Sequence, residues 1–227
     1  MDLVRDIRAL RDGIEGAGGI RGLRGARLLV GGYAAENVDF QHDLLERFPL
    51  LIALVLGTTA VMLAVIFRSV LIPLKAILLN SASVAATFGI VVLAFQDGLG
   101  AGLLGLDGPA AAIFVVVPVS VFATVFGLSM DYEIFLLARI KEEYDARGDN
   151  TAATIHGLAA VASTITSAAL IMAVVFGYFA FGRVLLLQFL GLGLAVAVVL
   201  DATVVRILLV PAIMDLAGRW NWWPGRR

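Results

Sequence analysis

The sequence contains no cysteine and only two histidines, His42 and His156. The absence of cysteine excludes disulfides, thiol nucleophiles and cysteine-bound metal ions. The two histidines lie too far apart in the sequence to suggest a metal site, and no cofactor is expected. There is no cluster of lysine and arginine with interleaved aromatic residues, which argues against a nucleic-acid partner. A glycine-rich phosphate loop of the Walker type is also missing, so ATP is not the expected energy source.

Charge is scarce as well, because only 15% of the residues are charged while 60% are hydrophobic and the mean hydropathy is +0.96. These values indicate an integral membrane protein. A hydrocarbon layer of about 30 Å needs roughly 20 apolar residues per helix. Five stretches meet this requirement, at residues 48–67, 72–95, 111–138, 156–180 and 184–213. Their short connections favour antiparallel neighbours in one all-α bundle.

Basic residues are distributed unequally between the two sets of predicted loops. The first turn, the connection after the third span and the C-terminal tail at residues 214–227 together hold eight lysines and arginines, whereas the opposite loops hold only Arg183. Because cytoplasmic loops are enriched in lysine and arginine, we expect a cytoplasmic C-terminus and an extracytoplasmic N-terminal segment. Lys75 is interpreted as opening the second span, without a further role.

Residues 1–47 precede the predicted spans and carry many charges of both signs. An amphipathic helix is expected near the start, followed by a short strand at residues 27–32. The segment has no apolar signal core, and a folded, charged segment should not cross a membrane alone. We therefore expect that the chain is the C-terminal part of a longer protein or needs a partner that supplies a missing half. The apolar positions of the expected helix are Leu3, Ile7, Leu10 and Ile14.

The third predicted span contains ionisable residues at bilayer depth. A carboxylate in hydrocarbon costs between about 2.5 and more than about 10 kcal/mol, so it persists where it faces a bundle interior or a water-filled path. Asp131 continues a row of small or polar residues with the spacing i, i+4, i+7 and i+11, and this row is expected to face neighbouring helices. A buried carboxylate that only supports helix packing is the alternative for Asp131. The other members of the row are Ser120, Thr124 and Gly127.

Several runs in the sequence resemble the MmpL family of the resistance-nodulation-division (RND) superfamily. The main run is Gly127-Leu-Ser-Met-Asp-Tyr-Glu-Ile-Phe-Leu-Leu137, followed by Arg139-Ile-Lys-Glu-Glu-Tyr144. The resemblance extends to the C-terminal tail and covers essentially the whole chain. The further matching runs are residues 30–32, 193–198, 200–206, 209–212 and 218–223.

This resemblance implies an RND-type bundle whose five helices correspond to the eighth through twelfth of a family member. Residues 1–47 would then be a short α/β remnant of an extracytoplasmic porter domain, and residues 48–213 the transmembrane domain. The family's absent first half supplies a second Asp-Tyr pair that faces this one. By resemblance, Asp131 and Tyr132 belong to a proton relay that drives substrate export. Tyr132 is alternatively an interfacial aromatic residue, and Glu133 is open to both a relay and an interfacial interpretation.

The last span holds a second pair of charged residues, Asp201 and Arg206. Five residues along an α-helix correspond to about 140° of rotation, so the two side chains are not expected to share a face. Asp201 is expected to approach the third span, while Arg206 extends toward the cytoplasmic interface. The family pattern matches both positions and implies coupling roles. The simpler interpretations are a packing carboxylate for Asp201 and a positive-inside anchor for Arg206.

The sequence thus predicts a multi-pass protein of the bacterial plasma membrane that exports lipids or other hydrophobic molecules at the expense of the proton gradient. The alternatives are a lipid- or sterol-sensing membrane domain without transport and an inactive remnant. No nucleophile-base pair or metal ligand set was found, so an enzyme is not expected. The predicted partners are a hydrophobic substrate, protons, membrane lipids and the missing half. A homo-oligomer is compatible with the superfamily, and neither the oligomeric state nor the substrate can be read from the sequence.

Overall fold

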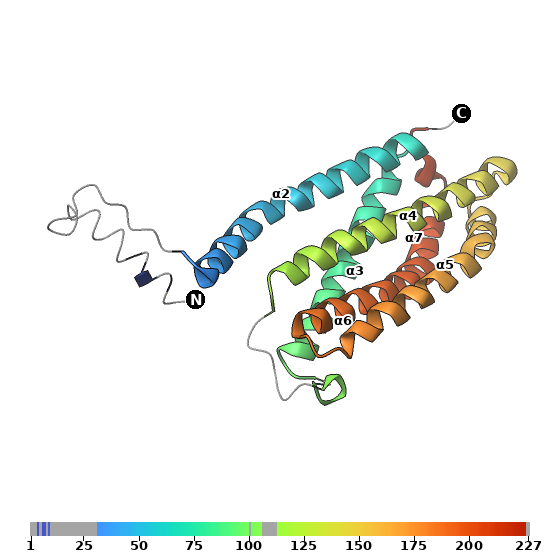
Figure 1. Cartoon of the computed structure of the whole chain (residues 1–227). Helices are drawn as coiled ribbons and strands as arrows, with labels where there is room; N and C mark the ends of the chain where they lie inside the picture. The colour runs from blue at the N-terminus through green and yellow to red at the C-terminus, as the bar shows by residue number, and fades with distance from the viewer. Residues whose placement is uncertain are drawn as a thin grey trace, which may run out of the picture. The chain divides into compact units, whose positions relative to one another are not determined.

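The protein is helical throughout the part of the chain that the computed structural model describes. The model describes residues 31–99, 101–105 and 113–225, together with Val4, Asp6, Ile7 and Ala9. The order of the elements is α2 (Tyr33–Phe67), α3 (Leu71–Phe95), the 3-10 helix η1 (Ala101–Leu104), α4 (Val116–Arg147), α5 (Asn150–Ala180), α6 (Leu185–Leu200), the π-helix η2 (Asp201–Leu209), α7 (Val210–Ala217) and the 3-10 helix η3 (Gly218–Trp222) (Figure 1).

Five helices are long and apolar enough to cross a membrane, which confirms the expected number of spans. The fifth runs through α6, η2 and α7 to Trp222. The chain divides into two compact units, residues 1–50 and 51–227, and the division falls inside α2 immediately after Pro49 and Leu50. The prediction of domains at 1–47, 48–213 and 214–227 stays a prediction.

The expected α/β remnant is wrong for the residues that can be tested. No strand forms among the described residues, and Gly31 and Gly32 at the end of the expected strand lie in coil and bend conformations. Residues 33–47 belong instead to α2, because the helix continues without interruption from Tyr33 into the first span. Residues 27–30 lie outside the described part of the chain. Of the residues expected in the amphipathic helix, only Ile7 is described, and it is helical.

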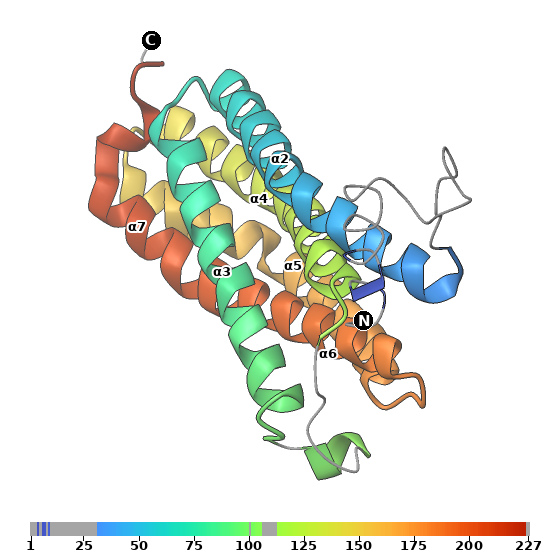
Figure 2. The same cartoon turned by 90° about the vertical axis from the view of Figure 1, so that its left-hand side faces the viewer.

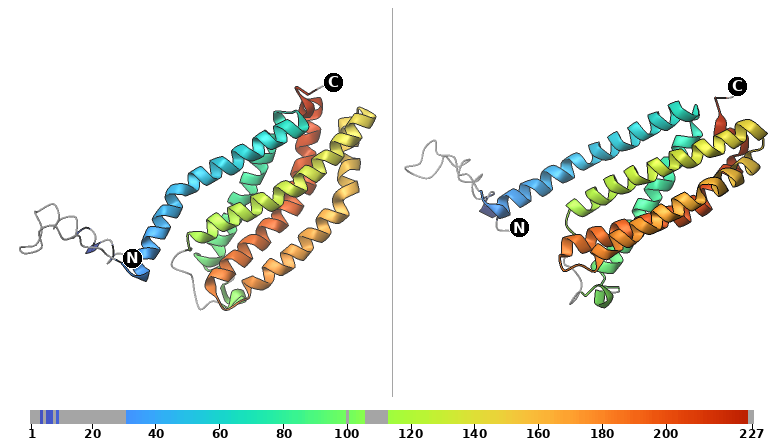
Figure 3. Two further views of the ribbon diagram at one scale, coloured as in Figure 1. Left: turned by 45° about the horizontal axis from the view of Figure 1, so that its top comes forward. Right: turned by 45° about the vertical axis from the view of Figure 1, so that its right-hand side comes forward.

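The second unit places α3 on one side of the bundle and α5 on the other, with α4 and α6 between them (Figure 2). The views in Figure 3 show α4 and α5 running side by side. This pair packs closely at Gly157, where a Cβ atom would lie only 2.8 Å from the Cα atom of Ile140. Gly191 makes a similar approach between α6 and the end of α5, because an added Cβ would lie 2.7 Å from the Phe176 carbonyl oxygen. Both glycines therefore serve helix packing, as small residues do in membrane bundles.

The C-terminal segment folds back onto the turn between α2 and α3. Ser69 Oγ donates to the Asn221 carbonyl oxygen over 2.6 Å, and the Gly225 N–H donates to the Arg68 carbonyl over 3.0 Å. Trp222 is buried and stacks on Tyr144, with ring centroids 5.1 Å apart. The segment thus joins α3, α4 and the end of α7 into one packed end of the bundle.

Lys75 takes part in this packed end, so the interpretation that it has no further role is wrong. Its Nζ is buried and donates to Asn221 Oδ1 over 2.5 Å, and it also contacts Met214 Sδ. The Asn221 side chain is fully buried, and its Nδ2 donates to the carbonyl oxygens of Met214 and Gly218, each over 2.7 Å. One asparagine therefore satisfies a buried ammonium group and two helix-end carbonyls, which is the kind of capping that a buried helix terminus requires.

Replacing this side chain is expected to loosen the packed end. Asn221→Ala should lower the free energy of unfolding by about 1–3 kcal/mol, because it leaves the buried Lys75 ammonium without its oxygen acceptor. Titration of the purified chain in mixed micelles with a denaturing detergent measures the change. Arg219→Ala is the matched control, since Arg219 is an exposed neighbour on the same 3-10 helix. Equal stability of the two variants would contradict a structural role for Asn221.

Candidate functional site

The two charges of the last span meet because the helix changes its winding at that point. From Asp201 to Leu209 the backbone is a π-helix, in which hydrogen bonds join residues five apart, and the Val210 N–H accordingly bonds to the Val205 carbonyl. Residues five apart then lie on one face, unlike in an α-helix. Arg206 Nη2 lies 2.6 Å from Asp201 Oδ2, and both side chains are buried. The expectation that Asp201 and Arg206 do not share a face is wrong, because it assumed α-helical rotation.

Arg206 points into the bundle rather than along the helix toward the interface. Its side chain is only 4% exposed, and Nη2 also donates to the Ser129 carbonyl oxygen over 2.8 Å. Its guanidinium carbon lies 5.1 Å from the ring centroid of Tyr132, within cation–π range. The expected extension of Arg206 toward the cytoplasmic interface is therefore wrong. Because Arg206 binds η2 to α4, it couples the fifth span to the third.

A small cavity lies where α4, α5 and η2 meet. Its polar lining consists of Ser129, Tyr132, Asp201 and Arg206, and the remainder is apolar. Asp201 and the third span thus border the same space, as expected. The cavity brings together three of the five predicted relay residues, Tyr132, Asp201 and Arg206.

Glu133 lies on a different side of α4 and faces α3. It is buried, and its Oε2 accepts a hydrogen bond of 3.0 Å from Asn80 Nδ2. It also interacts electrostatically with Lys75, Arg206 and Asp201. The sequence did not point to Asn80, because one amide among apolar residues carries no periodic signal. A buried amide within an apolar span is costly unless it is hydrogen-bonded. An amide at this position in the sequence therefore indicates a polar partner on another helix, and Asn80 could have been identified on this ground.

Asp131 is separated from these groups. It lies on the exposed face of α4 together with Gly127, while Ser120 and Thr124 are half-buried. Gly127 and Asp131 are therefore not packed within this chain, and the expectation that the row faces neighbouring helices stays a prediction. The face of α4 that packs carries larger apolar side chains, with Ser129 and Glu133 among them. The reason is that burial of bulky apolar side chains outweighs the close approach that small residues permit.

A comparison with known protein families decides the identity of the chain: residues 4–227 match the family model described as the MMPL family. The chain belongs to the MMPL family. It is 44% identical to a putative membrane protein of Streptomyces coelicolor, over 90% of this chain and 29% of that protein. It is 45% identical to the heme uptake protein MmpL11 of Mycobacterium tuberculosis, over 87% of this chain and 20% of the relative.

The trehalose monomycolate exporter MmpL3 of Mycobacterium tuberculosis is 41% identical, over 89% of this chain and 21% of that protein. The MMPL chain thus spans less than a third of the length of each of these relatives. The names of the two mycobacterial relatives describe an uptake protein and an exporter, and the family membership agrees with the resemblance found in the sequence.

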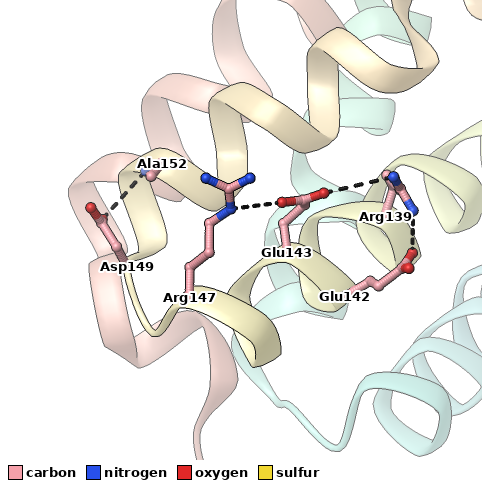
Figure 4. A network of polar contacts seen from close by, with 6 residues as sticks. All are labelled: Arg139, Glu142, Glu143, Arg147, Asp149 and Ala152. Carbon is pink, nitrogen blue, oxygen red and sulfur yellow. Dashed lines mark hydrogen bonds and ion pairs between the residues drawn. The ribbon is translucent and has the colours of Figure 1, made fainter.

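The charged residues that follow the third span of the MMPL chain form a separate network of half-buried and exposed side chains. Glu143 pairs with Arg147 over 2.9 Å and with Arg139 over 3.7 Å, as Figure 4 shows. Asp149 caps α5 by accepting hydrogen bonds from the N–H groups of residues 151 and 152. The connection between the third and fourth spans is short, because α4 continues to Arg147 and α5 starts at Asn150. Ion pairs near the surface contribute at most about 1 kcal/mol each to folding stability. Their role here is therefore limited to local stabilisation of the end of α4.

Groups of three or more residues that could hold a metal ion do not occur in the described part of the chain. The buried polar side chains in the described spans are carboxylates, the Arg206 guanidinium, the Lys75 ammonium, amides and hydroxyls. Such groups can accept, donate and transfer protons. An ionisable residue inside a membrane span marks a functional site by default, and the MMPL chain places them in two clusters at the junctions of α4 with α3 and with η2.

Proposed function

We propose that the MMPL chain forms part of the membrane domain of a transporter that uses the proton gradient to export lipids or other hydrophobic molecules. The observation that supports this most strongly is the buried Asp201–Arg206 pair, which lies between α4, α5 and the last span and is linked to α4 through Ser129. Buried charges are expensive in hydrocarbon and are retained where they carry protons, ions or substrate.

The proposed relay has two parts on opposite sides of α4. Asp131, on the exposed face, is the group that takes up and releases a proton, and the adjacent Tyr132 lies beside Arg206. Glu133, Asp201 and Arg206 form the buried part, in which a change of charge on one group alters the electrostatic energy of the others. Movement of a proton at α4 would thereby reach η2, and a π-helix is a frequent site of such functional adjustment.

The exposed position of Asp131 also supports a partner. A carboxylate on the outer face of a spanning helix is stable only where another polar group or water covers it. We propose that the face of α4 containing Gly127 and Asp131 packs against the missing half or a partner subunit. The C-terminus would lie in the cytoplasm of a bacterial cell, as the distribution of basic residues predicts. A homo-oligomer remains a prediction.

The substrate class rests on the names of relatives. One is a trehalose monomycolate exporter, and MmpL11 of Mycolicibacterium smegmatis is a mycolic acid-containing lipids exporter. An apolar, lipid-like substrate is therefore proposed, with no resident cofactor and no ATP site.

Export measured with and without a protonophore tests the energy source. In cells that produce the transporter containing this sequence, dissipating the proton gradient at constant ATP should reduce export of labelled lipid to the level of cells without the transporter. Lowering ATP while the proton gradient is kept constant should leave export unchanged. Export that resists the protonophore would overturn the proposal. A complete lack of export under every condition would instead favour a lipid-sensing domain or an inactive remnant.

A further inference from the structure

The turn between α2 and α3 lies at a membrane boundary. One apolar span ends at Phe67 and the next begins at Leu71, so only residues 68–70 connect two helices that are long enough to cross the bilayer. So short a connection lies at the depth of the lipid headgroups, where tryptophan is enriched and long basic side chains extend. Exposed side chains of this turn therefore face lipid headgroups.

The C-terminal segment lies directly against this turn. The Val70 N–H donates to the Trp223 carbonyl oxygen over 3.3 Å, and the two side chains are 59% and 54% exposed. The Gly225 N–H donates to the Arg68 carbonyl oxygen, and a Cβ atom on Gly225 would lie only 2.6 Å from the Arg68 Cβ. Arg68 is also exposed, whereas Ser69 is buried. The junction thus presents a cation, an aliphatic side chain and an indole on residues that backbone hydrogen bonds hold together.

Arg68 is held in a backbone conformation that favours glycine. Its φ is 47°, the one positive φ of a residue other than glycine in the described part of the chain. A residue with a Cβ atom adopts this left-handed region at a steric cost that glycine avoids. Backbone strain of this kind clusters at ligand-binding sites, so an arginine at this position indicates a role for its side chain.

The positive charge of Arg68 is not compensated within the described residues, where its guanidinium forms no ion pair. Arg219, an exposed residue of η3, likewise has no ion pair there. The acidic residues at the adjoining ends of α4 and α7 are already bonded to basic residues of α4 or to a threonine of α5; they are Glu142, Glu143, Asp145 and Asp215. The junction therefore attracts a negatively charged group.

We propose that Arg68, Val70 and Trp223 form a binding site for the headgroup of an anionic membrane phospholipid. The Arg68 guanidinium donates hydrogen bonds to the phosphate oxygens, for which its planar fork of N–H groups is suited. Trp223 and Val70 contact the glycerol backbone and the first methylene groups of the acyl chains, because an indole has both an apolar body and a polar N–H. A net negative headgroup is favoured over a zwitterionic one, since basic residues beside a span attract anionic lipids.

The bound phospholipid would connect the ends of two spans with the C-terminal segment. The site is distinct from the proposed relay, because the polar cavity beside Asp201 is lined by residues of α4, α5, α6 and η2 and by none of the turn or the C-terminal segment. The lipid would therefore be a resident component of the membrane domain, and its binding does not depend on the proposed export.

Native mass spectrometry of the purified chain in detergent, with phosphatidylglycerol or phosphatidylcholine added, tests the site. We expect the wild-type chain to bind one phosphatidylglycerol more tightly than phosphatidylcholine. Arg68→Gly should weaken the binding of phosphatidylglycerol about tenfold or more, because hydrogen bonds to a charged group are lost. Arg68→Lys, which keeps the charge, should retain most of the affinity.

Arg183→Gly is the matched control. Arg183 is also exposed and forms no ion pair among the described residues, but it precedes α6, whose Phe189 packs on Phe95 at the far end of α3. Its substitution should leave phosphatidylglycerol binding unchanged. Thermal unfolding of Arg68→Gly in lipid-free detergent, followed by circular dichroism, should occur at or above the wild-type temperature, because glycine relieves the strain at this position.

Four results would overturn the proposal. Phosphatidylglycerol that binds Arg68→Gly as tightly as the wild type would remove Arg68 from the site, and an equal loss in Arg183→Gly would show non-specific attraction. Displacement of the lipid by an equal concentration of glycerol 3-phosphate would assign the site to a soluble phosphate compound. Earlier unfolding of Arg68→Gly would contradict the strained backbone. Because no transport is measured, a chain that binds the phospholipid but belongs to a transporter without proton-driven export would contradict only the proposed function.

Discussion

Arg206→Met is expected to destabilise the chain more than any other single substitution of a charged residue. The variant removes the 2.6 Å ion pair with Asp201 and the hydrogen bond to the Ser129 carbonyl, and it leaves a carboxylate buried without its counter-ion. Breaking a buried pair by removing one partner costs about 3–5 kcal/mol. Unfolding of the purified chain in mixed micelles, followed by circular dichroism, measures the loss.

A double variant separates the cost of the unpaired charge from the value of the pair. Asp201→Asn combined with Arg206→Met removes both charges, and replacing a buried pair by neutral groups is often close to neutral for stability. We therefore expect the double variant to recover most of the stability that Arg206→Met loses. Arg219→Met, at an exposed position, should change stability by no more than about 0.5 kcal/mol. A single variant as stable as the wild type would show that Arg206 does not hold η2 against α4.

Asp131→Asn is expected to abolish export while the protein stays folded. Asp131 lies on the exposed face of α4, so the isosteric amide should fit without rearrangement of the bundle. An amide cannot take up and release a proton at physiological pH, which a relay requires. Proton-driven lipid export by the transporter containing this sequence, with the amount of protein in the membrane measured in parallel, tests the expectation.

The control for this experiment is Glu142→Gln. Glu142 is an exposed carboxylate on the same helix, and it pairs with Arg139 beyond the apolar part of the span. Its substitution should leave export near the wild-type level. Unimpaired export by Asp131→Asn, at an equal amount of protein, would remove Asp131 from the relay and favour a role limited to contact with a partner.

The two variants probe different parts of the proposed relay. Arg206 is buried and stabilises the packing of η2 on α4, whereas Asp131 is exposed and contributes little to packing within this chain. A loss of stability is therefore expected only at Arg206, and a loss of export without a loss of stability only at Asp131. This difference follows from burial rather than from residue type, since both are charged residues of spanning helices.

The sequence alone determined the membrane class, the five spans and the family. Hydropathy depends on composition over about 20 residues, which neighbours in space do not change. The family resemblance rests on runs such as residues 127–137, and the family match confirms it. The ionisable residues at bilayer depth were equally evident, because a charge in an apolar run is conspicuous wherever its side chain points.

Only the tertiary structure decided where those residues point and what they contact. The pairing of Asp201 with Arg206 depends on a π-helix, and the helical period assumed from the sequence was that of an α-helix. Hydropathy also does not reveal which face of a uniformly apolar helix packs within this chain, so the exposure of Asp131 was not predicted. Asn80 and Lys75 gained their importance from residues 50 or more positions away, through the bonds of Asn80 to Glu133 and of Lys75 to Asn221. In an apolar bundle, a buried polar side chain must find a hydrogen-bond partner because leaving it unpaired is costly. Which residue is that partner depends on how the helices pack, and the sequence alone does not show this.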